Sequence, residues 1–150
     1  MEKLSLKTTK GVIILKKIFL SKSLKSATIF LIGWCGYYLI ELAFRGYSHW
    51  TMGLCGGICF LQMYFINCRY QHFPLIFRAL ICTLFITFVE FIAGCLLNLW
   101  LGLEIWDYSE LPYNVLGQIS LTFSCLWFYL SLVLCILISL FNKLTGRKKF

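Results

Sequence analysis

Four long apolar runs, separated by short polar segments, constrain this chain more than any other feature. They lie at about 26–44, 50–66, 75–101 and 115–141. About 20 helical residues cross the ~30 Å hydrocarbon core of a bilayer. Of the 150 residues, 60% are hydrophobic, whereas soluble domains hold roughly 45–50%. The sequence therefore predicts an all-α, polytopic membrane protein whose transmembrane domain, residues 26–141, is a four-helix bundle.

The second run is the weakest of the four. It is short and contains Gly53, Gly56 and Gly57, so a re-entrant hairpin is the alternative to a full span. Helices are favoured over barrel strands throughout, because the runs are continuous and do not alternate over about ten residues. Both prolines, Pro74 and Pro112, lie between runs, where they break no helix.

The basic residues lie mostly at the two ends of the chain. Residues 1–25 contain seven lysines and the tail 142–150 contains four basic residues. With Arg69 and Arg78, they place thirteen of the fourteen Lys and Arg on one side of a four-span topology, and Arg45 alone on the other. The positive-inside rule then predicts cytoplasmic termini, in the cytoplasmic membrane of the cell, with the basic ends on its anionic leaflet. A non-spanning second run would spoil this division.

Other readings of the composition are less favourable. The net charge of +8 is not gathered on a folded basic face, so no nucleic-acid partner is expected. The first 25 residues are predicted to be an interfacial helix or a basic tail rather than a cleaved signal peptide, since Lys16 and Lys17 interrupt their apolar stretch. The eight cysteines fall in or beside apolar runs without a CxxC, so we expect small hydrophobes, no metal site and no cofactor.

One acidic residue lies at membrane depth. Glu90 is about midway along the third run, with Gly94 and Asn98 on the same helical stripe. An ionisable group at a helix centre costs at least ~2.5–3.5 kcal/mol. A polar intramembrane site of Glu90, Asn98 and Gln118 is therefore one prediction. The alternative is a protonated Glu90 that bonds across helices, with Gly94 admitting a neighbouring backbone.

Two further patterns indicate structural contacts. Glu41 and Arg45 are spaced i,i+4 at the end of the first run, which predicts an interfacial ion pair. Gly53 and Gly57 form a GxxxG spacing, which permits close helix packing within one chain or between protomers.

The segment from Leu103 to Gln118 is the least generic part of the chain. Its aromatic residues are typical of an interface belt, and Asn114 is predicted to cap the fourth run. A folded external loop and a recognition surface are both compatible with this segment. Its motif residues are Trp106, Asp107, Tyr108, Pro112 and Asn114.

No catalytic motif is visible. The chain has no HExxH, GxSxG or GxxxxGK[ST]. His49 and His72 fall in loops on opposite sides of the predicted topology, and the loop acids are typical of a solvated turn. We therefore predict that the protein is not an enzyme.

The stretches Ile40–Phe60 and Val89–Phe128 resemble the putative ABC-transporter type IV family, small bacterial membrane proteins described as ABC transporter permeases. The resemblance covers roughly Phe30 to Leu132. It is most specific in WDYS-x-x-P-x-N-x-x-G-Q (Trp106 to Gln118), preceded by E-F-x-x-G-x-x-x-N (Glu90 to Asn98). Other characteristic positions that it covers are Glu41, Arg45, Gly46, Gly56 and Gly57.

The resemblance implies a permease-like transport component. Such a component needs a separate ATPase subunit, because this chain has no nucleotide site, and four spans would have to form a homo-oligomer to enclose a path. The alternative function is a non-transport membrane adaptor that binds a partner through its acidic loop or basic ends.

Overall fold

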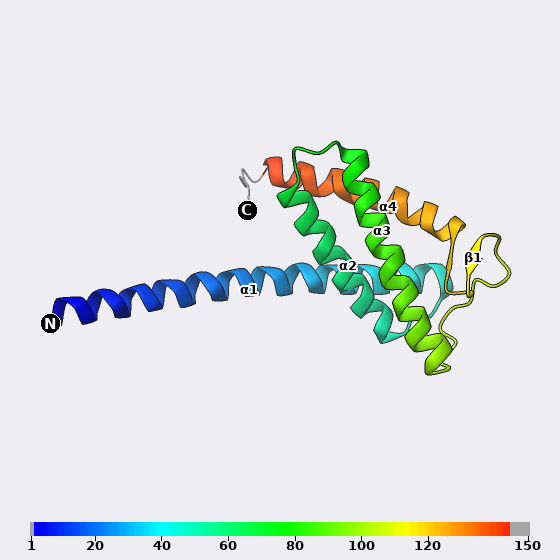
Figure 1. Ribbon diagram of the computed structural model, residues 1–150, viewed down its shortest axis with the longest axis horizontal. Helices are drawn as coiled ribbons and strands as arrows, with labels where there is room; N and C mark the ends of the chain where they lie inside the picture. The colour runs from blue at the N-terminus through cyan, green and yellow to red at the C-terminus, as the bar shows by residue number, and fades with distance from the viewer. Residues whose placement is uncertain (1, 145–150) are drawn as a thin grey trace.

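The computed structural model describes residues 2–144, with side chains from Ser21 onward. Its elements are α1 (Glu2–Arg45), α2 (Trp50–Arg69), α3 (Leu75–Gly94), a π-helical continuation η1 (Cys95–Trp100), a hairpin of β1 (Asn114–Val115) and β2 (Ile119–Ser120), and α4 (Leu121–Leu144) (Figure 1). Four stretches are long and apolar enough to cross a membrane: Ser21–Arg45, Trp50–Arg69, Leu75–Trp100 and Leu121–Leu144. The predicted all-α, multi-pass membrane protein is confirmed.

Helix α2 is the central helix of the bundle, since it contacts α1, α3 and α4. Half of its most apolar window is buried, against 11%, 28% and 17% in the other three spans. It also has the lowest mean hydropathy, 1.3. A helix that faces protein rather than lipid needs fewer apolar side chains, which explains the weak second run. Its 20 residues form one unbroken helix of about 30 Å, and not a re-entrant hairpin.

The glycines of α2 let α1 approach closely. A Cβ on Gly53 would lie 2.6 Å from the Trp34 indole, and one on Gly57 would lie 2.6 Å from the Phe30 ring. Helix packing through small residues is common in membranes because lipid gives no hydrophobic drive between helices. The GxxxG spacing therefore serves packing within this one chain.

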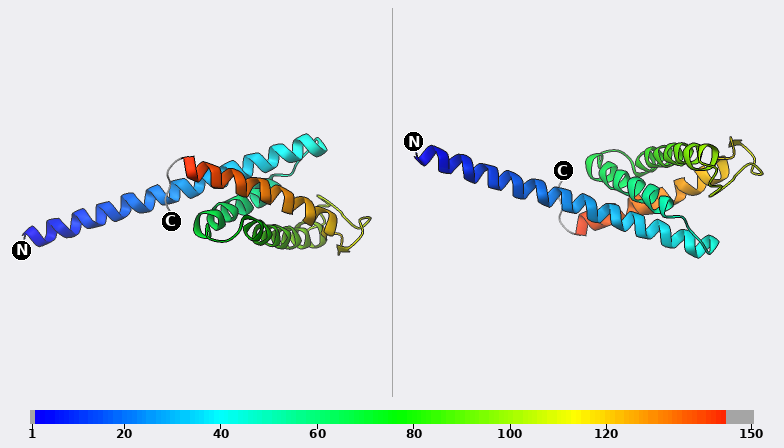
Figure 2. Two further views of the ribbon diagram at one scale, coloured as in Figure 1. Left: turned by 90° about the horizontal axis from the view of Figure 1, so that it is seen from above. Right: turned by 90° about the horizontal axis from the view of Figure 1, so that it is seen from below.

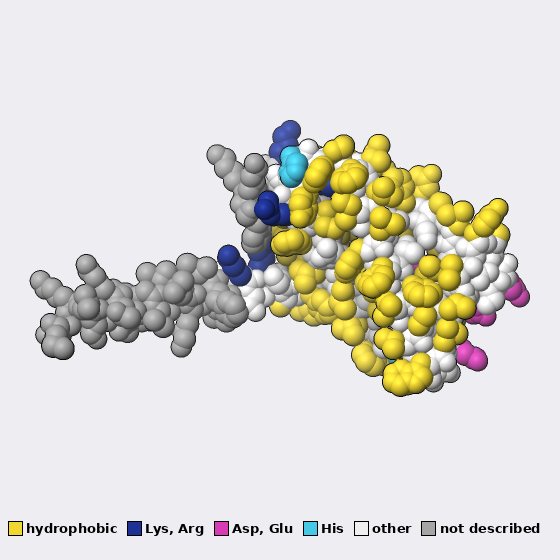
Figure 3. All heavy atoms as spheres, viewed as in Figure 1, with side chains coloured by type: hydrophobic (Ala, Val, Ile, Leu, Met, Phe, Trp, Pro, Cys, Tyr) yellow, Lys and Arg dark blue, Asp and Glu magenta, His cyan; other side chains and the backbone are white. Residues whose placement is uncertain are grey.

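A buried core lies where the C-terminal halves of α2 and α4 meet the first part of α3. The outer surface of the bundle is apolar as well. Figure 3 shows hydrophobic side chains over most of one face, with Lys and Arg at one edge and Asp and Glu at the other. This distribution fits a bilayer as the solvent. The core residues are Met63, Ile66, Ala79, Cys82, Ile86, Cys135 and Ile138.

The N-terminal segment is helical. Helix α1 runs without a break from Glu2 to Arg45, and the views in Figure 2 show it extending beyond the other helices. Residues 2–25 are thus helix continuous with the first span rather than an unstructured tail. Most of the predicted basic tail, from residue 145 on, lies outside the described residues.

The fourth span begins later than predicted. Helix α4 starts at Leu121 and not at 115, because residues 114–120 turn back as the hairpin, with Asn114 paired to Ser120. Asn114 does not cap the helix. The Ser120 hydroxyl takes that role and accepts a hydrogen bond from the Phe123 N–H at 3.3 Å. The predictions of a start at 115 and of an Asn114 cap were wrong.

Candidate functional site

A cavity of about 250 Å³ lies among the four spans. Helix α1 contributes Tyr37, α2 contributes its Gly56 face, α3 contributes Glu90 and α4 contributes Trp127. Ile32 and Ile40 also line it and are 57% and 53% exposed, so the cavity reaches the apolar surface of α1. Its walls are almost entirely apolar, and Glu90 carries the one carboxylate among the lining residues.

Two neutral donors hold the Glu90 carboxylate. Trp127 Nε1 donates to Oε2 at 2.9 Å, and the Tyr108 hydroxyl donates to Oε1 at 3.0 Å. Burial, and then the nearby negative charge of Glu90, raise the pKa of Tyr108 above its ordinary value, so its hydroxyl keeps its proton and stays a donor. The carboxylate is therefore fixed in orientation by neutral donors, with no ion pair to Glu90 among the residues that the structure describes.

The loop of residues 101–120 folds back onto the end of α3 and η1, and Asn98 holds it there. Asn98 Nδ2 donates to Trp106 O at 2.9 Å and to Gln118 Oε1 at 2.8 Å. Its Oδ1 accepts from the Ile105 N–H at 2.8 Å. All the hydrogen-bonding groups of the buried Asn98 amide are thus in use, which fits the rule that buried polar groups are paired.

Gly94 leaves the space into which Gln118 folds. A Cβ at Gly94 would lie 2.6 Å from Gln118 Oε1, and Gln118 is only 3% exposed. Trp106 is buried beside it, 6% exposed, and donates from Nε1 to Gln118 O at 3.0 Å. Because Trp106 also lines the cavity, the loop forms the wall of the cavity at this end of the bundle.

The Glu41–Arg45 pair also fastens the loop. Glu41 and Arg45 form a salt bridge, and Arg45 Nη1 donates to Ile105 O at 3.0 Å. The Glu41 side chain is 8% exposed and that of Arg45 is 23% exposed. The predicted ion pair is present, but it is largely buried and ties α1 to the loop.

Polar side chains also shape the loop itself. Asp107 Oδ1 accepts from the Ser109 hydroxyl at 2.6 Å and from the Ser109 N–H at 2.9 Å, and these bonds lower the pKa of Asp107. Gly117 has φ +67°, and a Cβ there would lie 2.4 Å from Ser109 Oγ, so only glycine fits. Asn114 Nδ2 donates to Leu111 O at 2.8 Å, and Asn114 therefore braces the hairpin.

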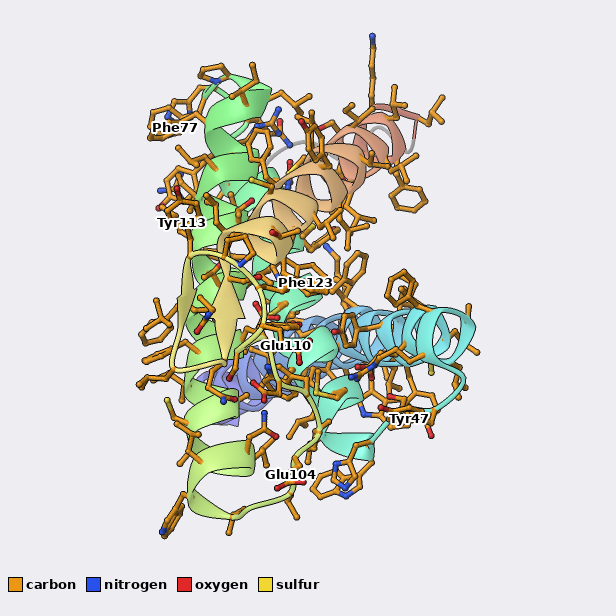
Figure 4. The ribbon with its side chains drawn as sticks, turned by 90° about the vertical axis from the view of Figure 1, so that its right-hand side faces the viewer. Tyr47, Phe77, Glu104, Glu110, Tyr113 and Phe123 are labelled. Atoms are coloured by element: carbon orange, nitrogen blue, oxygen red, sulfur yellow. The ribbon has the colours of Figure 1, made fainter. Side chains whose placement is uncertain are left out.

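The structure divides the predicted polar site into two parts. Asn98 and Gln118 meet each other and hold the loop, whereas Glu90 lines the cavity with Trp127 and accepts a hydrogen bond from Tyr108. Gln118 is also in the loop and not in the fourth span. Of the predicted aromatic belt, Trp106 faces inward and Tyr113 is 81% exposed. Figure 4 looks onto this end, with Glu104, Glu110 and Tyr113 labelled on the loop.

Sequence reasoning missed Tyr37, Trp127 and the surroundings of Arg78. Tyr37 and Trp127 lie 5.9 Å apart between ring centroids, across α1 and α4, and no spacing in the sequence links them. Arg78 is 7% exposed inside the bundle, not in a loop. Its Nη1 donates to Asn67 Oδ1 at 2.9 Å and to Ser139 Oγ at 3.2 Å.

These features define a polytopic helical membrane protein with an apolar cavity, one carboxylate in it and a folded loop closing one end. A family model described as putative ABC-transporter type IV matches residues 54–147, which include most of α2 and all of α3, the loop and α4. The chain belongs to this family. No curated protein and no solved structure matches it.

Proposed function

We propose that the protein is the membrane-spanning component of a transport system and that its solute binds in the Glu90 cavity. The observation that carries the proposal is a cavity inside the span region with a single carboxylate held by Trp127 and Tyr108. A solid bundle that served only as an anchor would gain nothing from a buried carboxylate, which is costly at membrane depth.

The family and the charge pattern also support a proposal for the remaining parts of the system. A separate ATPase supplies the energy, since the sequence has no phosphate-binding loop. Copies of the chain assemble to complete the path. The protein lies in the cytoplasmic membrane with both termini inside, which is supported by the thirteen-to-one division of Lys and Arg.

The test compares solute levels in cells that lack the protein with those in cells that express variants. We expect deletion to change the level of one or a few solutes. Glu90→Gln should reproduce that change at an unchanged amount of protein in the membrane. Glu110→Gln removes the same charge from an exposed loop position and should restore the wild-type levels. Full complementation by Glu90→Gln would contradict a transport role for this site.

A second function, that of an adaptor, is supported by the outer face of the loop. Tyr113 is 81% exposed and Leu116 is 64% exposed, and Glu104, Asp107 and Glu110 are exposed around them. Crosslinking should then start from Tyr113, because Trp106 faces inward. If the adaptor function holds, Tyr113→Ala fails to complement the deletion, whereas Glu90→Gln complements it.

A further inference from the structure

The cavity has the features of a site for one chemical class of solute. Tyr37, Trp106 and Trp127 line it together with Glu90, and the Trp127 indole lies against the carboxylate, to which its Nε1 donates. Aromatic faces attract cations within about 6 Å of the ring centroid, and more strongly when water is excluded. Phe60 is a fourth aromatic residue in the lining. A carboxylate and four aromatic rings in an apolar cavity together favour a positive charge.

The neutral donors leave the Glu90 carboxyl group without a cationic partner among the residues that the structure describes. The hydrogen bonds from Trp127 and Tyr108 occupy one position on each carboxylate oxygen, and a carboxylate oxygen has further lone pairs. In the described part of the chain, the one salt bridge joins Arg45 to Glu41 and not to Glu90. A bound cation would supply the missing countercharge.

Other solute classes fit the cavity poorly. A sugar or another hydrophilic solute would need many polar partners, and the walls are mostly aliphatic and aromatic. A metal ion needs several oxygen, nitrogen or sulfur ligands. The residues that the structure describes include no group of three His, Cys, Asp or Glu placed to hold one. An anion would be repelled by Glu90, and a neutral apolar molecule would leave that charge unpaired.

We propose that the Glu90 cavity binds a small lipophilic organic cation, a protonated or quaternary amine on an apolar body, with the charge at Glu90 and the rings. This proposal names the chemical class of the solute, and it rests on the proposed function in treating the bound molecule as a transported solute. The cavity of about 250 Å³ is smaller than the ~300–1,000 Å³ of drug-sized pockets, so a cation with one ring fits. Its opening at Ile32 and Ile40 faces the bilayer, from which such a cation can enter.

The test measures binding to the purified full-length chain in nanodiscs of zwitterionic lipid, with empty nanodiscs subtracted. The probes are benzyltrimethylammonium, its neutral carbon isostere neopentylbenzene, and tetramethylammonium, which has the charge without the ring. We expect benzyltrimethylammonium to bind at least about tenfold more tightly than either of the others. Equal affinity for the cation and its neutral isostere would overturn the proposal.

Variants locate the binding. Glu90→Gln should weaken benzyltrimethylammonium about tenfold or more, and Glu110→Gln should leave it unchanged. Gly36→Leu provides a test that keeps Glu90, because Gly36 lines the cavity and a Cβ there meets nothing within 4 Å. This variant should fill the cavity and abolish binding. Unaltered binding in either cavity variant would refute the site.

The two proposals fail separately. The binding experiment needs no ATPase and no transport, so it judges the cation site alone. Binding of neopentylbenzene that is as tight as that of the cation, and that Gly36→Leu abolishes, would reject the cationic class and leave the cavity available for a transported neutral solute.

Discussion

The two ends of the bundle bury polar side chains in different ways. At the loop end, residues 98–120, each buried side-chain nitrogen or oxygen has a hydrogen-bond partner. At the Arg78 end, where α2 and α4 finish and α3 begins, Arg78 Nε and Asn142 Oδ1 are buried without one among the described residues. Arg78 also bonds to the neutral side chains of Asn67 and Ser139, and within the described part of the chain it is paired with no carboxylate.

The difference concerns specificity more than strength. A fully paired network fixes one arrangement, because any displacement leaves a buried group unpaired at a cost of roughly 1–3 kcal/mol. An incompletely paired cluster already contains unpaired buried groups, so a displacement costs less free energy and the helices are held less firmly. We therefore expect the loop end to be rigid and the Arg78 end to be the place where helices shift. Four experiments test this difference between the two ends.

The largest expected effect is that of Asn98→Ala. The change removes three hydrogen bonds and leaves Trp106 O, Gln118 Oε1 and the Ile105 N–H to find new partners. We expect a loss of about 3 kcal/mol or more, measured as a lower Tm in detergent. Tyr113→Ala, on the exposed side of the same loop, is the control. An unchanged Tm in Asn98→Ala would contradict the rigid loop end.

Arg45→Gln should have the next largest effect. It leaves the buried Glu41 without its cation and removes the bond to Ile105 O. The loss should be about 2 kcal/mol, below the ~3–5 of a fully buried pair because Arg45 is partly exposed. Arg69→Gln removes the same charge at the exposed end of α2 and should change stability by less than about 0.5 kcal/mol. Equal effects would show that the pair does not fasten the loop.

At the Arg78 end, the double variant Arg78→Met with Asn67→Leu should be nearly neutral. Replacing a buried charge and its polar partner with apolar groups of similar volume is often neutral or stabilising. We expect a change within about 1 kcal/mol, by the same unfolding measurement. A loss as large as that of Asn98→Ala would mean that the two ends are alike.

The smallest effect concerns acid and the loop. The pKa of Asp107 lies below its ordinary value of 3.8, because the carboxylate accepts bonds from the Ser109 hydroxyl and N–H. The contribution of Asp107 to loop order is therefore complete above about pH 3.8 and disappears as the pH falls through the lowered value. An NMR titration of the Ser109 amide should show this, and Asp107→Asn should abolish it. A titration midpoint above pH 3.8 would mean that the pKa of Asp107 is raised and would contradict this prediction.

Much of the fold could be predicted because hydropathy and charge are local signals. The number of spans and the depth of Glu90 need only run lengths and positions along a helix. The loop could not be predicted in the same way. Its contacts join Asn98 to Gln118 and Arg45 to Ile105 across many residues, and a Trp before a turn reads as an interface residue whether it points outward or inward. The start of α4 was missed because apolar hairpin residues extend its run.

The central place of α2 also bears on how the chain enters the membrane. Helix α2 has a mean hydropathy of 1.3, the lowest of the four spans, and its glycines pack against Trp34 and Phe30. Transfer of α2 alone from water into lipid is therefore the least favourable of the four. Helix α1 is synthesised first and carries both of those aromatic rings. We therefore expect the insertion of α2 to depend on α1, so that the first two helices enter the membrane as one hairpin, to which α3 and α4 are then added.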